Sequence, residues 1–527
     1  MKKYYIMALA ACLGLASLSS CSGDLDLKEK GVTTVDEYYQ TDDEATSAVV
    51  TLYSRLHDLG TSYLMVKNAL SDDCYIGGVG MPIDEVNEFR FTSDNAELTS
   101  LFQGYYNIIY AANIIINKVE PNTAVKSRAV AEAKYFRGWA YFELTTLWGP
   151  VPLITEAIRD NYRESNSTED KIWAQIETDL KEAVASNALP SKSNVNDKDT
   201  PVRITKEAAE AMLGKAYLWE KKYAEANTQF DAVINSGLYA MMPLGSDGYL
   251  GYASYRNDNN SEVMLQINRL NDASAYGTEL TCMFVGLPAT NFLGTNNGRS
   301  PFYGECWGFS SGTRDGLVEA FLQNAKKNGV DDERYLTTIY SVQRLESEFG
   351  LTVKPGGFFQ GSVGYFTTKY ASLNENHIPM TWAGFQQNTT LMRYAEVLLL
   401  AAESHLMAGD QTNALKYVNI IRQHAGEPQL TTVTLDDIKL EKRLELCNEC
   451  VRYQDLLRWG DAYNELKDQG KRMAYYGYLS DSGKLELQYP ETQFKKDAGF
   501  KQNKNELLPF PYAEMNVNPN IKQNPGY

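Results

Sequence analysis

Residues 211–237 carry small and aromatic side chains at a spacing that fits two helices packed closely against each other. The segment reads AMLGKAYLWEKKYAEANTQFDAVINSG. Gly214 and Ala226 are small enough to let two helix backbones approach, and Tyr217 and Phe230 fill the space beside them. The pattern predicts a helical hairpin, which must bury its apolar face against further elements of the same kind.

The offsets in this segment are those of a tetratricopeptide unit, and parts of the pattern recur elsewhere in the chain. Gly138 and Tyr141 indicate the first helix of another unit. A weaker second copy places matching residues at Ala401, Ala402, His405, Ala414 and Val418, with Gly409 and Asp410 as its turn. Because repeat units stabilise one another, at least three are expected. Unrelated amphipathic hairpins are the alternative interpretation.

The N-terminus has the features of a bacterial lipoprotein signal. Met1-Lys2-Lys3 is followed by an uncharged, largely apolar run that ends at Cys21. Such a cysteine becomes acylated, and several acyl chains hold a protein firmly on a membrane. We therefore predict lipidation of Cys21. Cys12 fits the same pattern but leaves a shorter apolar core, and a plain secretory signal is the remaining alternative.

Charge and cysteine content narrow the class of protein. The formal net charge is −17, and removal of the signal with Lys2 and Lys3 makes the mature chain more acidic, which disfavours nucleic-acid binding. Besides the anchor, five cysteines remain in the mature chain, an odd number that specifies no disulfide framework: Cys74, Cys282, Cys306, Cys447 and Cys450. After the leader, no stretch of 18 uncharged apolar residues follows.

Apolar periodicity predicts helices over 36–59, 98–118, 129–147, 167–186 and 205–219. From about residue 240 to residue 388 the chain is rich in Gly, Asn and aromatic residues. In this segment we expect one strand at 262–268 and one helix at 314–328. The four prolines after residue 507 predict an extended tail, held by Phe510, Tyr512 and Met515. We expect a signal peptide (1–20), a lipidated tether (21–35), a helical part (36–240), a loop-rich ligand-binding insertion (241–390), and C-terminal helices with the tail (391–527).

Several segments together resemble one family, the SusD/RagB-like nutrient-binding lipoproteins. One of them reads EAKYFRGWAYFELTTLWGPVPLI and spans residues 132–154. The others are 202–226, 260–267, 392–403, 441–460 and 507–527. They follow the order of the family over nearly the whole mature chain, and together with the leader they make the resemblance specific. Asp24 and Asp26 resemble the signal that sends such lipoproteins to the cell surface.

The resemblance implies a fold, a partner and a location. The fold is mostly α, with about four tetratricopeptide-like helix pairs that support a loop-rich ligand-binding lobe with few short strands. The partner is a SusC-type TonB-dependent transporter, over which the protein acts as a lid and to which it passes a glycan or another nutrient. The location is the outer membrane, through the lipid anchor and facing the cell exterior. The resemblance implies no catalysis.

Three patterns suggest other chemistry, and each has a structural explanation. Cys447 and Cys450 form a lone CxxC within a predicted helix over 441–459, which lacks the four ligands of a closed zinc site. Residues 308–312 have the spacing of a nucleophile elbow but not its alternating strands and helices. Glu441, Glu445 and Glu449 share one helix face, with Arg452 as the expected ion-pair partner of Glu449 and Asp455. We expect no catalytic residue, no cofactor and no metal site.

Binding is the chemistry that remains. Aromatic rings contact the apolar face of a sugar, and Tyr or Trp can also hydrogen-bond its hydroxyl groups. The candidate ligand-binding residues are Trp307, Trp382, Tyr75, Tyr303, Phe309, Phe358, Phe359 and Asp73, with Phe385 as a further aromatic of the insertion. Core packing is the alternative role for each aromatic.

Two other functions stay open from the sequence. A tetratricopeptide adaptor that binds other surface proteins would use the surface around Tyr217 and His405. A surface glycosidase would depend on a carboxylate such as Glu445. The leading hypothesis is glycan capture at the cell surface together with a transporter.

Overall fold

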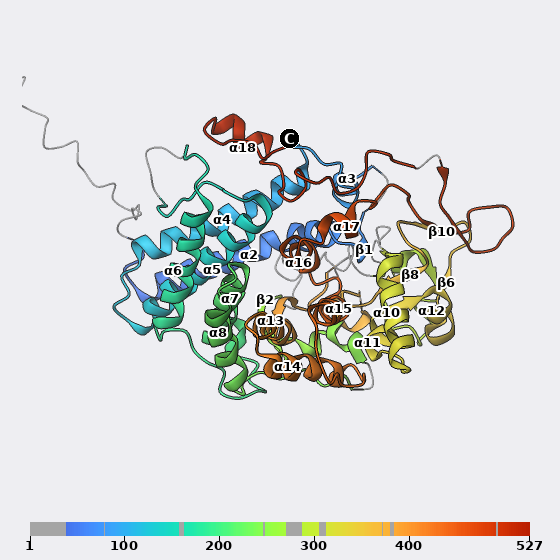
Figure 1. Cartoon of the computed structure of the whole chain (residues 1–527), viewed down its shortest axis with the longest axis horizontal. Helices are drawn as coiled ribbons and strands as arrows, with labels where there is room; N and C mark the ends of the chain where they lie inside the picture. The colour runs from blue at the N-terminus through green and yellow to red at the C-terminus, as the bar shows by residue number, and fades with distance from the viewer. Residues whose placement is uncertain are drawn as a thin grey trace, which may run out of the picture.

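Helices dominate the architecture, and one lobe of short strands stands beside them (Figure 1). The structure is a computed structural model that describes residues 38–77, 80–157, 163–245, 248–269, 287–304, 312–371, 373–379, 384–491 and 494–527. The longer helices are α2 (Asp42–Ala69), α4 (Ala96–Lys118), α5 (Ala124–Trp148), α6 (Glu169–Ala185), α7 (Lys206–Trp219), α8 (Tyr223–Asn235), α10 (Asp315–Asn328), α13 (Tyr394–Met407), α14 (Gln411–His424) and α15 (Leu435–Leu446). The shorter ones are α3 (Pro82–Asn87), α11 (Glu333–Thr338), α12 (Val342–Phe349), α16 (Arg452–Trp459), α17 (Ala462–Leu466) and α18 (Tyr512–Val517).

Four helix pairs form the frame: α2 with α4, α5 with α6, α7 with α8, and α13 with α14. Each pair also packs on the next, through α4 with α5, α6 with α7 and α8 with α13. Figure 1 shows the first two pairs on one side of the molecule and the strand-bearing lobe on the other. The expected fold class, tetratricopeptide-like pairs supporting a loop-rich lobe, is confirmed.

Close contact between paired helices depends on glycine, as the spacing predicts. A Cβ atom on Gly214 of α7 would lie 2.7 Å from the ring of Phe230 on α8. A Cβ atom on Gly138 of α5 would lie 3.0 Å from Leu180 on α6. Side chains at these positions would push the helices apart.

Gly214→Ala is expected to lower the free energy of unfolding by about 1–3 kcal/mol, because the added methyl overlaps a fully buried ring. Gly316→Ala in α10 is the matched control, since its Cβ would meet only the end of Arg443 at 3.5 Å. The control gains helix propensity and is expected to leave stability unchanged or raise it by up to about 1 kcal/mol. Urea unfolding followed by circular dichroism measures both; equal effects would contradict the prediction.

The strands are short and antiparallel. They are β1 (Cys74–Tyr75), β2 (Val263–Ile267), β3 (Phe292–Leu293), β4 (Gly312–Thr313), β5 (Ile339–Ser341), β6 (Thr352–Val353), β7 (Phe358–Gln360), β8 (Tyr365–Thr367), β9 (Thr389–Arg393), β10 (Tyr475–Gly477) and β11 (Glu486–Gln488). β2, the strand expected at 262–268, pairs with β9, which leads directly into α13. This pair therefore joins the lobe to the helical frame.

The segment 441–459 is not one helix, which corrects the sequence prediction. α15 ends at Leu446, and Asn448 and Cys450 adopt left-handed backbone angles with φ of 67° before α16 begins. The break lets the backbone N–H of Cys450 donate to Oδ1 of Asn68 on α2 at 3.3 Å. Cys447 and Cys450 are buried free thiols, as expected, but they lie in a tight turn.

The C-terminal tail lies across the helices and is extended, apart from the short helix α18, which follows Pro511 (Figure 1). Phe510 is fully buried, as expected of an anchor. Tyr512 is 57 % exposed, so the expectation that it holds the tail is wrong. Trp148 takes that role instead: its Nε1 donates to the carbonyl of Pro509 at 2.9 Å.

Among the described residues, every helix is too short or too polar to cross a lipid bilayer.

Candidate functional site

Three of the expected ligand-binding aromatics cannot be placed. Trp307, Phe309 and Trp382, together with the expected lipidation site Cys21, lie outside the described residues. So do residues 308–311 of the proposed nucleophile-elbow pattern. These expectations remain predictions.

Tyr75, Asp73 and Phe359 are in the interior. The hydroxyl of Tyr75 donates to Asp84 at 2.6 Å, and the backbone of Gly361 packs on its ring. Asp73 is fully buried and pairs with Arg443 at 2.9 Å. Phe359 is fully buried in the core of the lobe. These three side chains present no surface to a ligand in this structure, so the site we propose does not include them.

Two other expected residues are at least partly accessible, at separate places on the lobe. Tyr303 stacks on His377 with a centroid separation of 3.9 Å, and Phe385 meets both rings edge-on at 5.8 Å. Phe358 is 45 % exposed and lies near Tyr475 of the neighbouring strand. The structure thus places Tyr303 and Phe385 together and Phe358 elsewhere.

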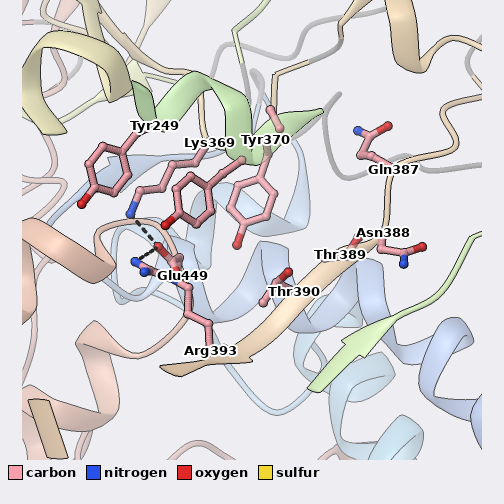
Figure 2. Close-up of a pocket in the computed structure, with 11 residues that line it drawn as sticks. Tyr249, Lys369, Tyr370, Gln387, Asn388, Thr389, Thr390, Arg393 and Glu449 are labelled. Carbon is pink, nitrogen blue, oxygen red and sulfur yellow. Dashed lines mark hydrogen bonds and ion pairs between the residues drawn. The ribbon is translucent and has the colours of Figure 1, made fainter. Parts of the chain in front are cut away.

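A narrow pocket lies where the lobe meets the helical frame (Figure 2). Its walls come from Tyr249 and Tyr252, from Lys369 and Tyr370, and from the segment that enters β9. The lining residues are Tyr249, Tyr252, Ala253, Lys369, Tyr370, Gln387, Asn388, Thr389, Thr390, Arg393 and Glu449. The cavity has a volume of about 50 Å³.

The charged end of the pocket is paired internally. Lys369 donates to Glu449 at 2.6 Å, and Arg393 donates to the same carboxylate at 2.7 Å, as Figure 2 shows. Arg393 also pairs with Glu262 at 2.9 Å and with Glu445 at 2.8 Å. Burial raises the pKa of Glu449, but Arg393 and Lys369 outweigh it and hold that pKa below its usual range. Both cations that line the pocket are therefore already paired with carboxylates, and Glu445 is also paired with Arg334 at 3.4 Å.

The opposite end of the pocket is uncharged and offers free hydrogen-bonding groups. The side chains of Tyr370, Gln387 and Thr390 line it, and none of the three has a hydrogen-bond partner among the described residues. Gln387 is only 8 % exposed, and its Oε1 is fully buried. Since buried polar groups are nearly always satisfied in native proteins, an unpaired amide in a cavity indicates a place for a polar ligand or water.

Two family models match this chain. The model of the SusD family matches residues 352–527, and a second model, described as starch-binding associating with outer membrane, matches residues 65–218. The two matches together cover more than half of the chain. The chain belongs to the SusD/RagB-like family.

Relatives of this SusD/RagB-like protein match along their whole lengths. A SusD-like protein of Bacteroides ovatus is 24% identical over 99% of this chain and 97% of its own. A solved laminarin binding SusD-like protein is 25% identical, with a TM-score of 0.75, over 93% of this chain and 100% of its own. Surface glycan-binding protein A from Bacteroides thetaiotaomicron, in complex with laminarihexaose, is 22% identical with a TM-score of 0.71, over 92% of this chain and 99% of its own, and shares the fold.

Glu441, Glu445 and Glu449 of this SusD/RagB-like chain belong to an ion-pair network. Glu441 pairs with Arg334 at 2.5 Å and with Arg422 at 2.9 Å. Glu445 is fully buried: burial raises its pKa, but Arg393 and Arg334 lower it to about 2. Structural pairing was the expected role, but the expected partner Arg452 is wrong, because it binds Asp72 instead.

No cluster of three or more His, Cys, Asp or Glu is arranged to hold a metal ion among the described residues of this family member. The free polar groups of the pocket were not among the residues predicted from the sequence. The run Gln386-Gln387-Asn388, directly before a strand that joins the two parts of the fold, was the available signal.

Asp258 supports the pocket wall of this SusD/RagB-like protein and makes the stability of the protein depend on pH. Its Oδ1 accepts from the backbone N–H of Asn388 at 2.9 Å, and burial raises its pKa to about 7. The folded protein therefore holds a proton that the unfolded chain releases, so stability falls as pH rises from about 4 to 7.

We expect Asp258→Asn, which keeps an acceptor and removes the buried charge, to raise the free energy of unfolding by about 2–4 kcal/mol at pH 8. At pH 4.5 the two proteins should be nearly equal, because Asp258 is then neutral in the folded wild type. Thermal unfolding at both pH values measures the difference. The same difference at pH 4.5 and pH 8 would disprove the role of Asp258.

Proposed function

We propose that this protein is a lipid-anchored, outer-membrane glycan-binding protein that captures oligosaccharides at the cell exterior and delivers them to a SusC-type TonB-dependent transporter. Support comes from family membership, from the outer-membrane association in the family description, and from the named glycan ligands of similar solved proteins. The pocket beside β9 is the observation that carries the proposal, since it combines an accessible aromatic ring with free hydrogen-bonding groups. The proposed anchor is Cys21.

Binding takes place without catalysis in this proposal. A glycosidase needs two accessible carboxyl groups on opposite sides of the bond that it cleaves. Glu445 is fully buried between two arginines and cannot reach a glycan. Glu449 is held by Lys369 and Arg393. These groups stabilise the fold around the site.

The adaptor alternative has less support. Tyr217 and His405 are only 6 % and 4 % exposed, because both fill the space between paired helices. His405 also lies between Asp231 and Asp410, at 3.1 and 3.0 Å. Side chains so enclosed offer little contact area to a partner protein.

Calorimetric titration of the mature protein with a broad panel of oligosaccharides tests the proposal. We expect saturable binding to at least one glycan and no release of shortened products. Co-purification from native membranes should recover a TonB-dependent barrel protein. Absence of binding across the panel, or turnover of a bound glycan, would overturn the proposed function.

A further inference from the structure

The size of the pocket beside β9 limits what can enter it. A water molecule needs about 10–15 Å³ of such space, so a cavity of about 50 Å³ admits roughly three to five water-sized groups. A whole pyranose ring does not fit. The hydroxyl and hydroxymethyl groups along one edge of a sugar do fit, with the rest of the glycan outside.

The free polar groups match that edge. Gln387 offers both an amide donor and a buried acceptor, and Tyr370 and Thr390 add two hydroxyl groups that can donate or accept. In Figure 2, Tyr370 and Thr390 face the same space, with Gln387 and Asn388 on one side of it. Neutral hydroxyl groups of a ligand can bind all three without a change in protonation.

The other end of the pocket sets its charge preference. Lys369 and Arg393 are the cations that could bind an acidic sugar, but Glu449, Glu445 and Glu262 already pair with them. A carboxylate placed here would be largely buried beside Glu449 and would find no unpaired cation, since Lys369 and Arg393 are both already engaged. The pocket therefore offers an acidic glycan no free cation with which to pair.

We propose that this pocket is a subsite for the uncharged hydroxyl and hydroxymethyl edge of a sugar, and that it selects neutral glycans over uronic-acid glycans. This inference rests on the proposed function. Gln387 and Thr390 bind the inserted groups, and Tyr370 adds a hydroxyl and a ring face. Replacing the hydroxymethyl group at C6 by a carboxylate weakens binding at least tenfold, because the carboxylate would be buried beside Glu449 without a free counter-charge.

Matched glycan pairs test the selectivity. Calorimetry compares β-1,4-mannan oligomers with β-1,4-mannuronate oligomers, and β-1,4-glucan oligomers with β-1,4-glucuronate oligomers, at the same salt concentration. We expect each neutral glycan that binds to do so at least tenfold more tightly than its uronate counterpart. Equal or tighter binding of the uronate would overturn the inference.

Variants locate the subsite. Gln387→Leu and Thr390→Val remove one hydrogen-bonding side chain each at similar volume, and we expect each to weaken neutral-glycan binding by about three- to tenfold. Tyr463→Phe is the control, because it removes an exposed hydroxyl on α17 outside the pocket, and it should bind like wild type. Circular dichroism confirms folding of all three.

The two proposals fail differently. If wild type binds neutral glycans and the Gln387→Leu/Thr390→Val double variant binds them equally well, the subsite is wrong and the proposed function stands. If wild type binds no glycan of either kind, the proposed function fails and the subsite falls with it.

Discussion

Arg334→Met should lower the free energy of unfolding by about 3–5 kcal/mol. Arg334 on α11 is 1 % exposed and pairs with Asp332 at 2.8 Å and Glu441 at 2.5 Å. Glu445 and Glu427 lie within 3.4 and 3.5 Å of the same guanidinium. Its loss leaves several buried carboxylates without their main counter-charge, and it also cuts the link between the lobe and α15.

Denaturant unfolding measures this effect against two further variants. Arg256→Met removes an exposed arginine that pairs with Glu375, and it should cost less than about 1 kcal/mol. Adding Glu441→Gln to Arg334→Met should restore part of the lost stability, because one uncompensated charge disappears. If Arg334→Met and Arg256→Met cost the same, the buried network does not hold the lobe to the frame.

Trp148→Ala should also cost about 3–5 kcal/mol, and it should release the C-terminal tail. The indole is fully buried, packs edge-on against Phe102 at 5.3 Å, and donates to Pro509. The backbone carbonyl of Trp148 accepts from Asn524 at 2.9 Å. One residue of α5 therefore anchors the tail at two points.

Thermal unfolding and limited proteolysis together test the role of Trp148. We expect rapid cleavage within 507–527 in Trp148→Ala. Tyr512→Ala is the matched aromatic control within the tail: its side chain is exposed, so neither stability nor cleavage should change. A tail that stays protected in Trp148→Ala would show that other contacts hold it.

Helix pairing could be predicted from sequence because its cause is local. The spacing of Gly214 and Phe230 is visible in one short segment, and the structure places a ring directly against that glycine. The turn at Cys447–Cys450 was missed because apolar periodicity continues across it. Its backbone angles serve a contact with Asn68, which lies far away in the sequence.

The site was harder to predict because burial depends on long-range packing. Tyr75 and Phe359 have the chemistry of sugar platforms, yet neighbours from distant segments enclose both. Gln387 has an ordinary appearance in the sequence, and its importance arises only because the lobe and frame leave its amide unpaired. Residue type alone cannot distinguish these outcomes.

Hydrogen–deuterium exchange of the mature protein, with and without a saturating neutral oligosaccharide, tests the central claim most directly. The account predicts ligand-dependent protection in residues 384–393 and around Lys369 and Tyr370, with the α7–α8 and α13–α14 pairs unchanged. Protection confined to those helix pairs, with none beside β9, would contradict it.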